Sequence, residues 1–98
     1  MKVKVEDVHF AYDIAKRCYN KQISFTYSAE IISKRTGMAI SSAKDYVYNF
    51  RRMMQGERYT RLLNRYATEY YIKQIRKDFG ETAYQMAILA TKKECRIL

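Results

Sequence analysis

The 98-residue sequence contains no proline and only three glycines. It also lacks long serine-rich or acidic runs. Proline and glycine are the residues that most often interrupt regular elements and turn the chain, so their scarcity leaves few places for sharp turns. This composition favours a few long helices over many short strands. The length suits one compact core, and we therefore expect a single helical domain over residues 1–98.

Cysteine and histidine are too few to build a zinc site from this chain alone. The candidate ligands are Cys18, Cys95 and His9, and neither cysteine belongs to a Cys-x-x-Cys pair. A structural zinc ion takes four ligands, so carboxylates or a second chain would have to supply the rest. We expect no bound metal and no cofactor, and we expect both thiols to be reduced.

Long apolar runs are missing as well. No stretch approaches the roughly 20 apolar residues that span a bilayer. At the start, MKVKVEDVHF, charged residues interrupt the apolar ones almost at once, which is not the pattern of a signal peptide. The sequence therefore predicts a cytoplasmic protein with no membrane partner.

Groups that perform catalysis do not stand out either. We find no nucleophile with a matched base, no glycine-rich phosphate loop and no cluster of metal ligands. The glutamates are scattered, and solvated helix faces explain them: Glu30, Glu57, Glu69, Glu81 and Glu94. We expect a protein without enzymatic activity.

Positive charge, in contrast, is abundant. The chain carries 19 Lys and Arg against 10 Asp and Glu, a net charge of +9. Such an excess favours a polyanionic partner, because each neutralised phosphate releases condensed counterions. An acidic protein would use the same charge, so the charge by itself leaves both classes of partner open.

Apolar residues recur three and four positions apart along most of the chain, which is the spacing of amphipathic helices. The spacing predicts an all-α fold of about five helices. We expect the first helix from Val5 to about Asn20, and the second from an N-cap at Thr26 or Ser28 to the turn at Gly37. The third should run from an N-cap at Ser41 or Ser42 to Gly56. The fourth should run from an N-cap at Asn64 to Phe79, and the fifth, after Gly80, from about Glu81 to Cys95. The expected buried face of the fifth helix consists of Ala83, Met86, Ala87 and Ala90.

The second and third of these helices are expected to meet in a corner that resembles a helix-turn-helix. A helix-turn-helix that reads DNA has a small residue late in its first helix, a glycine in the turn and an apolar residue after it. Ser33, Gly37 and Met38 occupy these positions. The residues placed to pack behind the turn are Ile32, Ala43 and Tyr46. Serine stands where alanine is commoner, and Ala43 stands where a branched residue is commoner, so the match is incomplete.

The start of the third helix supplies the side chains that would face a DNA groove. These candidates are Ser41, Ser42, Lys44, Asp45 and Tyr48. Serine and lysine donate hydrogen bonds to phosphates or base edges, and an aspartate accepts one from the amino group of cytosine. Asp45 would equally well stabilise the start of the helix. Corners with a glycine are also common in helical proteins that bind no DNA.

The segment that follows is strongly basic. Between Arg51 and Lys77 there are eight basic and two acidic residues, with four tyrosines among them. We expect phosphate contacts from some of five arginines: Arg51, Arg52, Arg58, Arg61 and Arg65. The tyrosines, which are Tyr59, Tyr66, Tyr70 and Tyr71, can stack on exposed bases. The alternative is a core position with a hydrated hydroxyl, which we expect for Tyr71 and consider for Tyr66.

Three runs of residues resemble part of a known protein family: RTGM, then SSAKDYVYNFRRMMQGERYTRLLNRYATEYYIKQI, then DFG. Together, over roughly Ala29 to Ala90, they resemble the N-terminal part of bacterial HNH-type endonucleases of restriction systems. The resemblance implies a helical module that lies ahead of a nuclease domain and contacts or targets DNA. HNH chemistry requires histidine as general base and metal ligands, and the only histidine here is His9, outside the resembling region. The resemblance therefore does not extend to nuclease activity.

Two functions from different classes follow. The first is a non-catalytic DNA-binding module with a helix-turn-helix-like corner, linked to bacterial or phage restriction or defence. The alternative is a small basic protein-interaction module, such as a phage inhibitor or adaptor, that binds a defence or nucleic-acid-processing complex, since Tyr and Arg dominate binding hot spots. A homodimer is compatible with the first function, because readers of palindromic DNA usually act as dimers. The sequence leaves open the DNA target, the oligomeric state and whether the chain is a fragment or stands alone.

Overall fold

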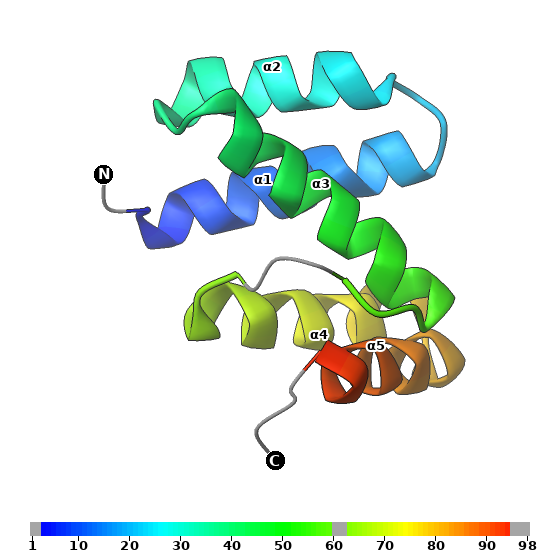
Figure 1. Ribbon diagram of the computed structural model, residues 1–98. Coiled ribbons are helices and arrows are strands. Elements are labelled where there is room, and N and C mark those ends of the chain that lie inside the picture. Colours follow the sequence, from blue (N-terminus) through cyan, green and yellow to red (C-terminus); the bar gives the residue numbers. More distant parts are fainter. Residues whose placement is uncertain (1–2, 60–62, 95–98) are drawn as a thin grey trace. The chain divides into compact units, whose positions relative to one another are not determined.

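The computed structural model describes residues 3–59 and 63–94, which form five α-helices and no strand (Figure 1). The helices are α1 (Val5–Tyr19), α2 (Phe25–Thr36), α3 (Ile40–Gln55), α4 (Arg65–Phe79) and α5 (Glu81–Glu94). The expected all-α class and the number of helices are confirmed.

The chain divides into two compact units, and the boundary falls inside α3. The first unit is Met1–Tyr48 and the second is Asn49–Leu98. The first unit thus contains α1, α2 and the first half of α3, and the second contains the rest of α3 with α4 and α5. The single domain expected from the length stays a prediction.

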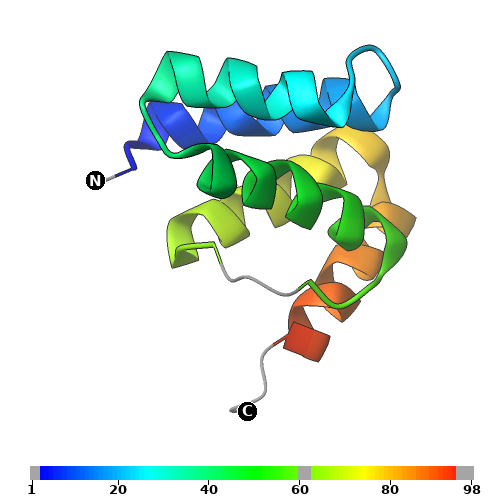
Figure 2. The ribbon, with the colours of Figure 1, turned by 45° about the horizontal axis from the view of Figure 1, so that its top comes forward.

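The first unit is built on α1 and α2, which run side by side in opposite directions (Figures 1 and 2). The buried residues of α1 recur three and four positions apart and form one side of the helix, as its apolar spacing predicts. The buried residues of this unit are Val8, Ala11, Tyr12, Ile14, Ala15 and Cys18 in α1, Ser28, Ala29 and Ile32 in α2, Met38 in the turn, and Ala43, Tyr46 and Val47 in α3. The Cys18 thiol is free and belongs to this core.

The start of α2 differs from the expected one. Its N-cap is Ser24, whose hydroxyl oxygen accepts a hydrogen bond from the backbone N–H of Tyr27 at 3.1 Å. Thr26 and Ser28 lie inside the first turn, and the Ser28 hydroxyl donates to the carbonyl of Ser24 at 2.6 Å. Ser28 is buried, so this bond back along the helix satisfies its hydroxyl and allows the helix to begin earlier.

The start of α3 also differs. The helix begins at Ile40, and the backbone N–H of Ala43 donates to the carbonyl of Ala39 at 3.0 Å. The expected N-caps, Ser41 and Ser42, therefore lie inside the first turn. The end of α3 agrees with the expectation, since Gly56 adopts a φ of +68° immediately after it.

In the second unit, α5 turns back along α4 after a single residue, Gly80 (Figures 1 and 2). The ring of Phe50 in α3 packs edge to face with two rings of α4. The distance between ring centroids is 6.1 Å to Tyr71 and 6.0 Å to Phe79. The expected N-cap of α4 is confirmed, because the Asn64 side-chain oxygen accepts from the N–H of Ala67 at 2.8 Å.

The buried face of α5 is narrower than expected. Ala87 and Ala90 are fully buried, whereas Met86 is 39% exposed. Met86 precedes Ala87 by one position, which turns it about 100° around the helix axis and away from the centre of the buried face. Ala83 is half-buried, so the fully buried part of the expected face consists of the two small residues Ala87 and Ala90.

Candidate nucleic-acid interface

The turn between α2 and α3 is held by side-chain hydrogen bonds at both ends. The Ser33 hydroxyl donates to the carbonyl of Met38 at 2.7 Å. The Thr36 hydroxyl donates to the carbonyl of Ile32 at 2.7 Å, and its oxygen accepts from the N–H of Met38 at 3.2 Å. Gly37 closes α2 with a φ of +81°, in the left-handed region that favours glycine. Sequence reasoning identified Ser33 and Gly37 but missed Thr36.

The residues expected behind this turn are all buried. Ile32, Met38, Ala43 and Tyr46 belong to the core of the first unit. Burial, and secondarily the nearby negative charge of Asp7 in α1, raise the pKa of the Tyr46 phenol. The burial of these residues thus agrees with the spacing from which the corner was predicted. It also determines which residues of α3 are left at the surface of the first unit.

The start of α3 presents a mixed polar surface. Ser41 and Lys44 are exposed, and Ser42, Asp45 and Tyr48 are half-buried. The structure adds Ile40, which is 41% exposed although it is apolar, one helical turn before Lys44. Sequence reasoning missed Ile40, because only the position where the helix begins shows that this side chain lies outside the core. An exposed apolar side chain beside donors is suited to contact the methyl group of thymine.

Four of the five candidate arginines can be placed, all in the second unit. Arg51 is exposed and Arg52 is half-buried on the last turns of α3, and Arg58 is exposed in the connector after it. The side chain of Arg65, the first residue of α4, is 91% exposed and pairs with Glu69 at 3.3 Å. An ion pair this exposed is weak and leaves the guanidinium available to a phosphate. Arg61 lies outside the described residues.

The tyrosines of the basic segment separate into two groups. Tyr71 is buried, as expected, and so is Tyr59, whose hydroxyl donates to the Thr91 hydroxyl of α5 at 3.2 Å. Tyr66 is 42% exposed, so the core position considered for it is wrong. Its ring stacks on that of Tyr70, with centroids 6.1 Å apart and planes at 18°. Only Tyr66 and Tyr70 of the four therefore remain candidates for base stacking.

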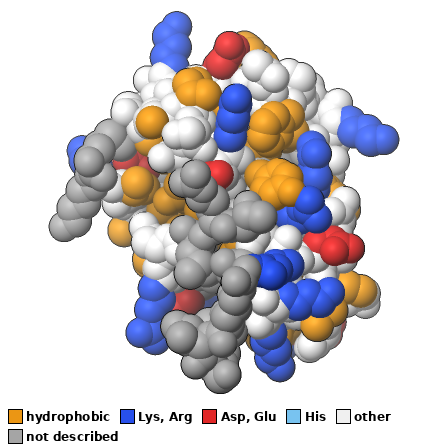
Figure 3. Space-filling view, in the orientation of Figure 1, with side chains coloured by type: hydrophobic (Ala, Val, Ile, Leu, Met, Phe, Trp, Pro, Cys, Tyr) orange, Lys and Arg blue, Asp and Glu red, His pale blue; other side chains and the backbone are white. Residues whose placement is uncertain are grey.

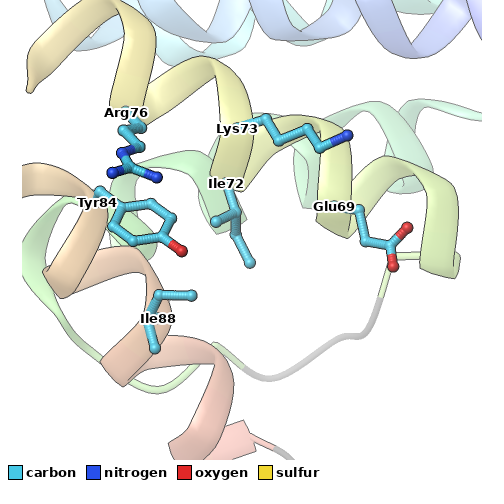
Figure 4. A pocket seen from close by; sticks show the side chains of 6 residues that line it. All are labelled: Glu69, Ile72, Lys73, Arg76, Tyr84 and Ile88. Carbon is cyan, nitrogen blue, oxygen red and sulfur yellow. The ribbon is translucent and has the colours of Figure 1, made fainter. Parts of the chain in front are cut away.

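A hollow of about 520 Å³ opens between α4 and α5 (Figure 4). The side chains of Ile72 and Ile88 point into it, and the guanidinium of Arg76 lies over the ring of Tyr84 at 4.7 Å. Arg76 also pairs with Glu81 at 3.0 Å. The hollow is open and has an apolar floor, and its one arginine is already engaged.

Basic side chains are more numerous than acidic ones on the molecular face that Figure 3 shows. Among residues 3–59 and 63–94 no group of three or more metal-ligating side chains occurs, and no helix of that part is long and apolar enough to span a membrane. The described surface residues can therefore bind a partner through hydrogen bonds, positive charge and aromatic stacking.

Comparison of the chain with models of known protein families, with curated proteins and with solved structures found no match of any kind.

Proposed function

We propose that the chain is a non-catalytic, cytoplasmic DNA-binding module that contacts duplex DNA with the start of α3. The observation that supports this most is the corner itself. Ser33 and Thr36 hold the turn, Ala43 and Tyr46 are buried behind it, and Ser41 and Lys44 remain exposed on the side of α3 that faces away. The major groove of B-DNA admits an α-helix, and helix-turn-helix proteins insert the start of their second helix into it.

The chemistry of the exposed residues fits this role. Lys44 is a donor to guanine or to phosphate, the Ser41 hydroxyl donates or accepts, and Ile40 offers apolar contact to a thymine methyl group. Asp45, Ser42 and Tyr48 flank them. The arginines that follow would add contacts to the phosphate backbone, which set the position of the module but not its sequence preference.

The resemblance to the segment ahead of HNH-type restriction endonuclease domains supports the same role. It favours a place in bacterial or phage restriction or defence, where a protein component of such a complex would be a further partner. The net charge of +9 supports any contact with nucleic acid, since the release of counterions from the phosphates supplies much of the free energy of such binding.

A binding assay with duplex DNA at low salt tests this function. The triple variant Lys44→Ala/Arg51→Ala/Arg52→Ala should bind at least about tenfold more weakly than the wild type, because charged contacts to DNA are lost. Arg17→Ala controls for the loss of one positive charge elsewhere, because Arg17 is exposed in the last turn of α1, outside the corner formed by α2 and α3. Absence of DNA binding by the wild type, or equal binding by the triple variant, would refute the proposal.

One observation favours the alternative function, a protein-interaction module. Two large apolar side chains of α5 are exposed, Met86 at 39% and Leu89 at 44%. The two residues lie three positions apart and so share one side of the helix, and methionine is enriched in the cores of protein interfaces. Recovery of one stable protein partner, whose binding is lost in Leu89→Ser, together with no affinity for DNA, would select this alternative.

A further inference from the structure

The stacked pair Tyr66 and Tyr70 stands on the outer side of α4, one helical turn apart. Their ring planes differ by only 18°, and Tyr66 is 42% exposed. The same helix buries Ala67, Tyr71 and Ile75 on its inner side. The tyrosine pair therefore lies beside the core stripe of α4 and adds aromatic surface to its solvent side.

Positive charge continues the row that the tyrosines begin. Lys73 and Lys77 follow Tyr70 by three and seven positions, which places them on the same side of a helix, and both are exposed. Arg65 lies next to Tyr66 at the start of the helix, with its side chain 91% exposed. One acidic residue, Glu69, lies between the two tyrosines in the sequence, and it forms the exposed ion pair with Arg65 at 3.3 Å.

Aromatic rings combined with a row of cations are the two elements of a site for single-stranded nucleic acid. Bases stack on aromatic side chains, and the cations follow the sugar-phosphate backbone. Duplex DNA does not suit these rings, because its bases already stack on each other inside the helix. Tyr66 and Lys77 lie eleven positions apart, which is about 16 Å at the rise of an α-helix. That length matches roughly five nucleotides at 3.4 Å each.

We propose that this face of α4, formed by Tyr66, Tyr70, Lys73 and Lys77, binds single-stranded nucleic acid. The bases stack on the tyrosine pair, and the phosphates lie along the two lysines. Arg76 lies in the neighbouring row and contacts Glu81 and the Tyr84 ring, so we do not count it among the residues of this site. The site shares no residue with the start of α3 and does not depend on duplex binding there.

The full chain titrated with a ten-nucleotide oligothymidylate tests the proposal. The protein has no tryptophan, so its intrinsic fluorescence comes from tyrosine and should be quenched when bases stack on the pair. Tyr66→Ala and Tyr70→Ala should each weaken binding by about 5- to 150-fold, the range of one lost base stack. Tyr66→Phe and Tyr70→Phe should keep most of the affinity, because the aromatic face remains.

Two controls separate stacking from charge and from misfolding. A strand of the same length without bases should bind more weakly than oligothymidylate, whereas equal affinity would overturn the proposal. Tyr27→Ala removes a tyrosine that is 54% exposed on α2 in the other unit, and it should leave strand binding unchanged. Far-UV circular dichroism checks that each variant is helical, and the phenylalanine variants test the site without removing a ring.

The outcomes also distinguish this site from the proposed duplex site. Lys44→Ala should weaken duplex binding and leave strand binding intact, and Tyr66→Ala should do the reverse. Strand binding that Tyr66→Ala and Tyr70→Ala leave unchanged overturns the proposal. So does an acidic peptide that binds as tightly as the strand and with the same dependence on the two tyrosines.

Discussion

At the scale of single residues, two glycines end helices in different backbone conformations. Gly37 has φ +81° and ψ −1°, the left-handed conformation that asparagine also tolerates. Gly80 has φ +96° and ψ −176°, a region that is accessible to glycine almost alone. No atom lies within 4 Å of a Cβ built on Gly80, so any cost of a side chain there comes from the backbone.

Alanine substitutions at these two glycines should therefore differ. Gly37→Ala should lower the free energy of unfolding by about 1 kcal/mol, and Gly80→Ala by about 2–3 kcal/mol. Asparagine should recover most of the loss at position 37 and little at position 80. Urea denaturation followed by circular dichroism measures all four variants. A smaller loss for Gly80→Ala than for Gly37→Ala would contradict this account of the two turns.

The ionisation of Tyr46 should make the free energy of unfolding depend on pH in the alkaline range. Burial, with the charge of Asp7, raises the pKa of its phenol above 10.0. Well below pH 10.0 the phenol is neutral in both the folded and the unfolded state, so its ionisation takes away no stability there. As the pH rises further, the unfolded state ionises first, so the folded state loses stability until the folded-state pKa is passed.

The free energy of unfolding of the wild type should thus fall more steeply between about pH 9 and pH 11 than that of Tyr46→Phe. The comparison of the two proteins cancels the titration of all other groups. Parallel pH profiles for the wild type and Tyr46→Phe would show that the Tyr46 hydroxyl does not titrate in a buried environment.

At the scale of elements, helix ends marked by a single candidate residue were predicted correctly from sequence. Gly37, Gly56 and Gly80 follow α2, α3 and α4, and Asn64 precedes α4. Errors arose where several hydroxyl residues compete. Ser24, Thr26 and Ser28 can each cap a helix, and which one does depends on the packing of the chain before it. The position of the first turn of α3 in turn decides that Ile40 is exposed.

The caps allow a matched pair of predictions, one in each unit. Asn64→Ala removes the acceptor of the Ala67 N–H, and Ser24→Ala removes the acceptor of the Tyr27 N–H. Each should lower the free energy of unfolding by about 1 kcal/mol, the usual cost of losing an N-cap. Asn64→Asp keeps an acceptor and should be nearly neutral. Thermal unfolding distinguishes these variants, and an unchanged stability of Asn64→Ala would show that the cap is replaced by water.

The same reasoning explains which site residues the sequence could indicate. Helical spacing around the turn was enough to expect Lys44 outside the core and Tyr46 inside it, and both agree with the structure. Spacing could not indicate that Tyr59 is buried, because its partner, Thr91, lies on α5 far along the chain. Spacing did indicate the core position of Tyr71, which lies four residues from both Ala67 and Ile75, but it left the position of Tyr66 open.

At the scale of the whole molecule, the net charge depends on composition alone, whereas the position of the exposed binding residues depends on the fold. The net charge of +9 follows from composition and predicts attraction to any polyanion. It does not predict where the polyanion binds. The two binding surfaces that we propose are placed instead by the exposed start of α3 in the first unit and by the tyrosine and lysine row of α4 in the second. The proposed function therefore depends on whether binding responds to particular residues and not to charge in general.

The salt dependence of duplex binding is the most direct test of that claim. The logarithm of the binding constant should fall steeply and linearly with the logarithm of the salt concentration. Lys44→Ala should weaken binding in either of two ways. If Lys44 contacts a phosphate, the slope should decrease by about one. If it contacts a base, binding should weaken by about 1–3 kcal/mol and the slope should stay unchanged. Arg17→Ala should match the wild type in both. If the two variants behave alike, or if no binding occurs at low salt, the start of α3 is not a DNA-binding site.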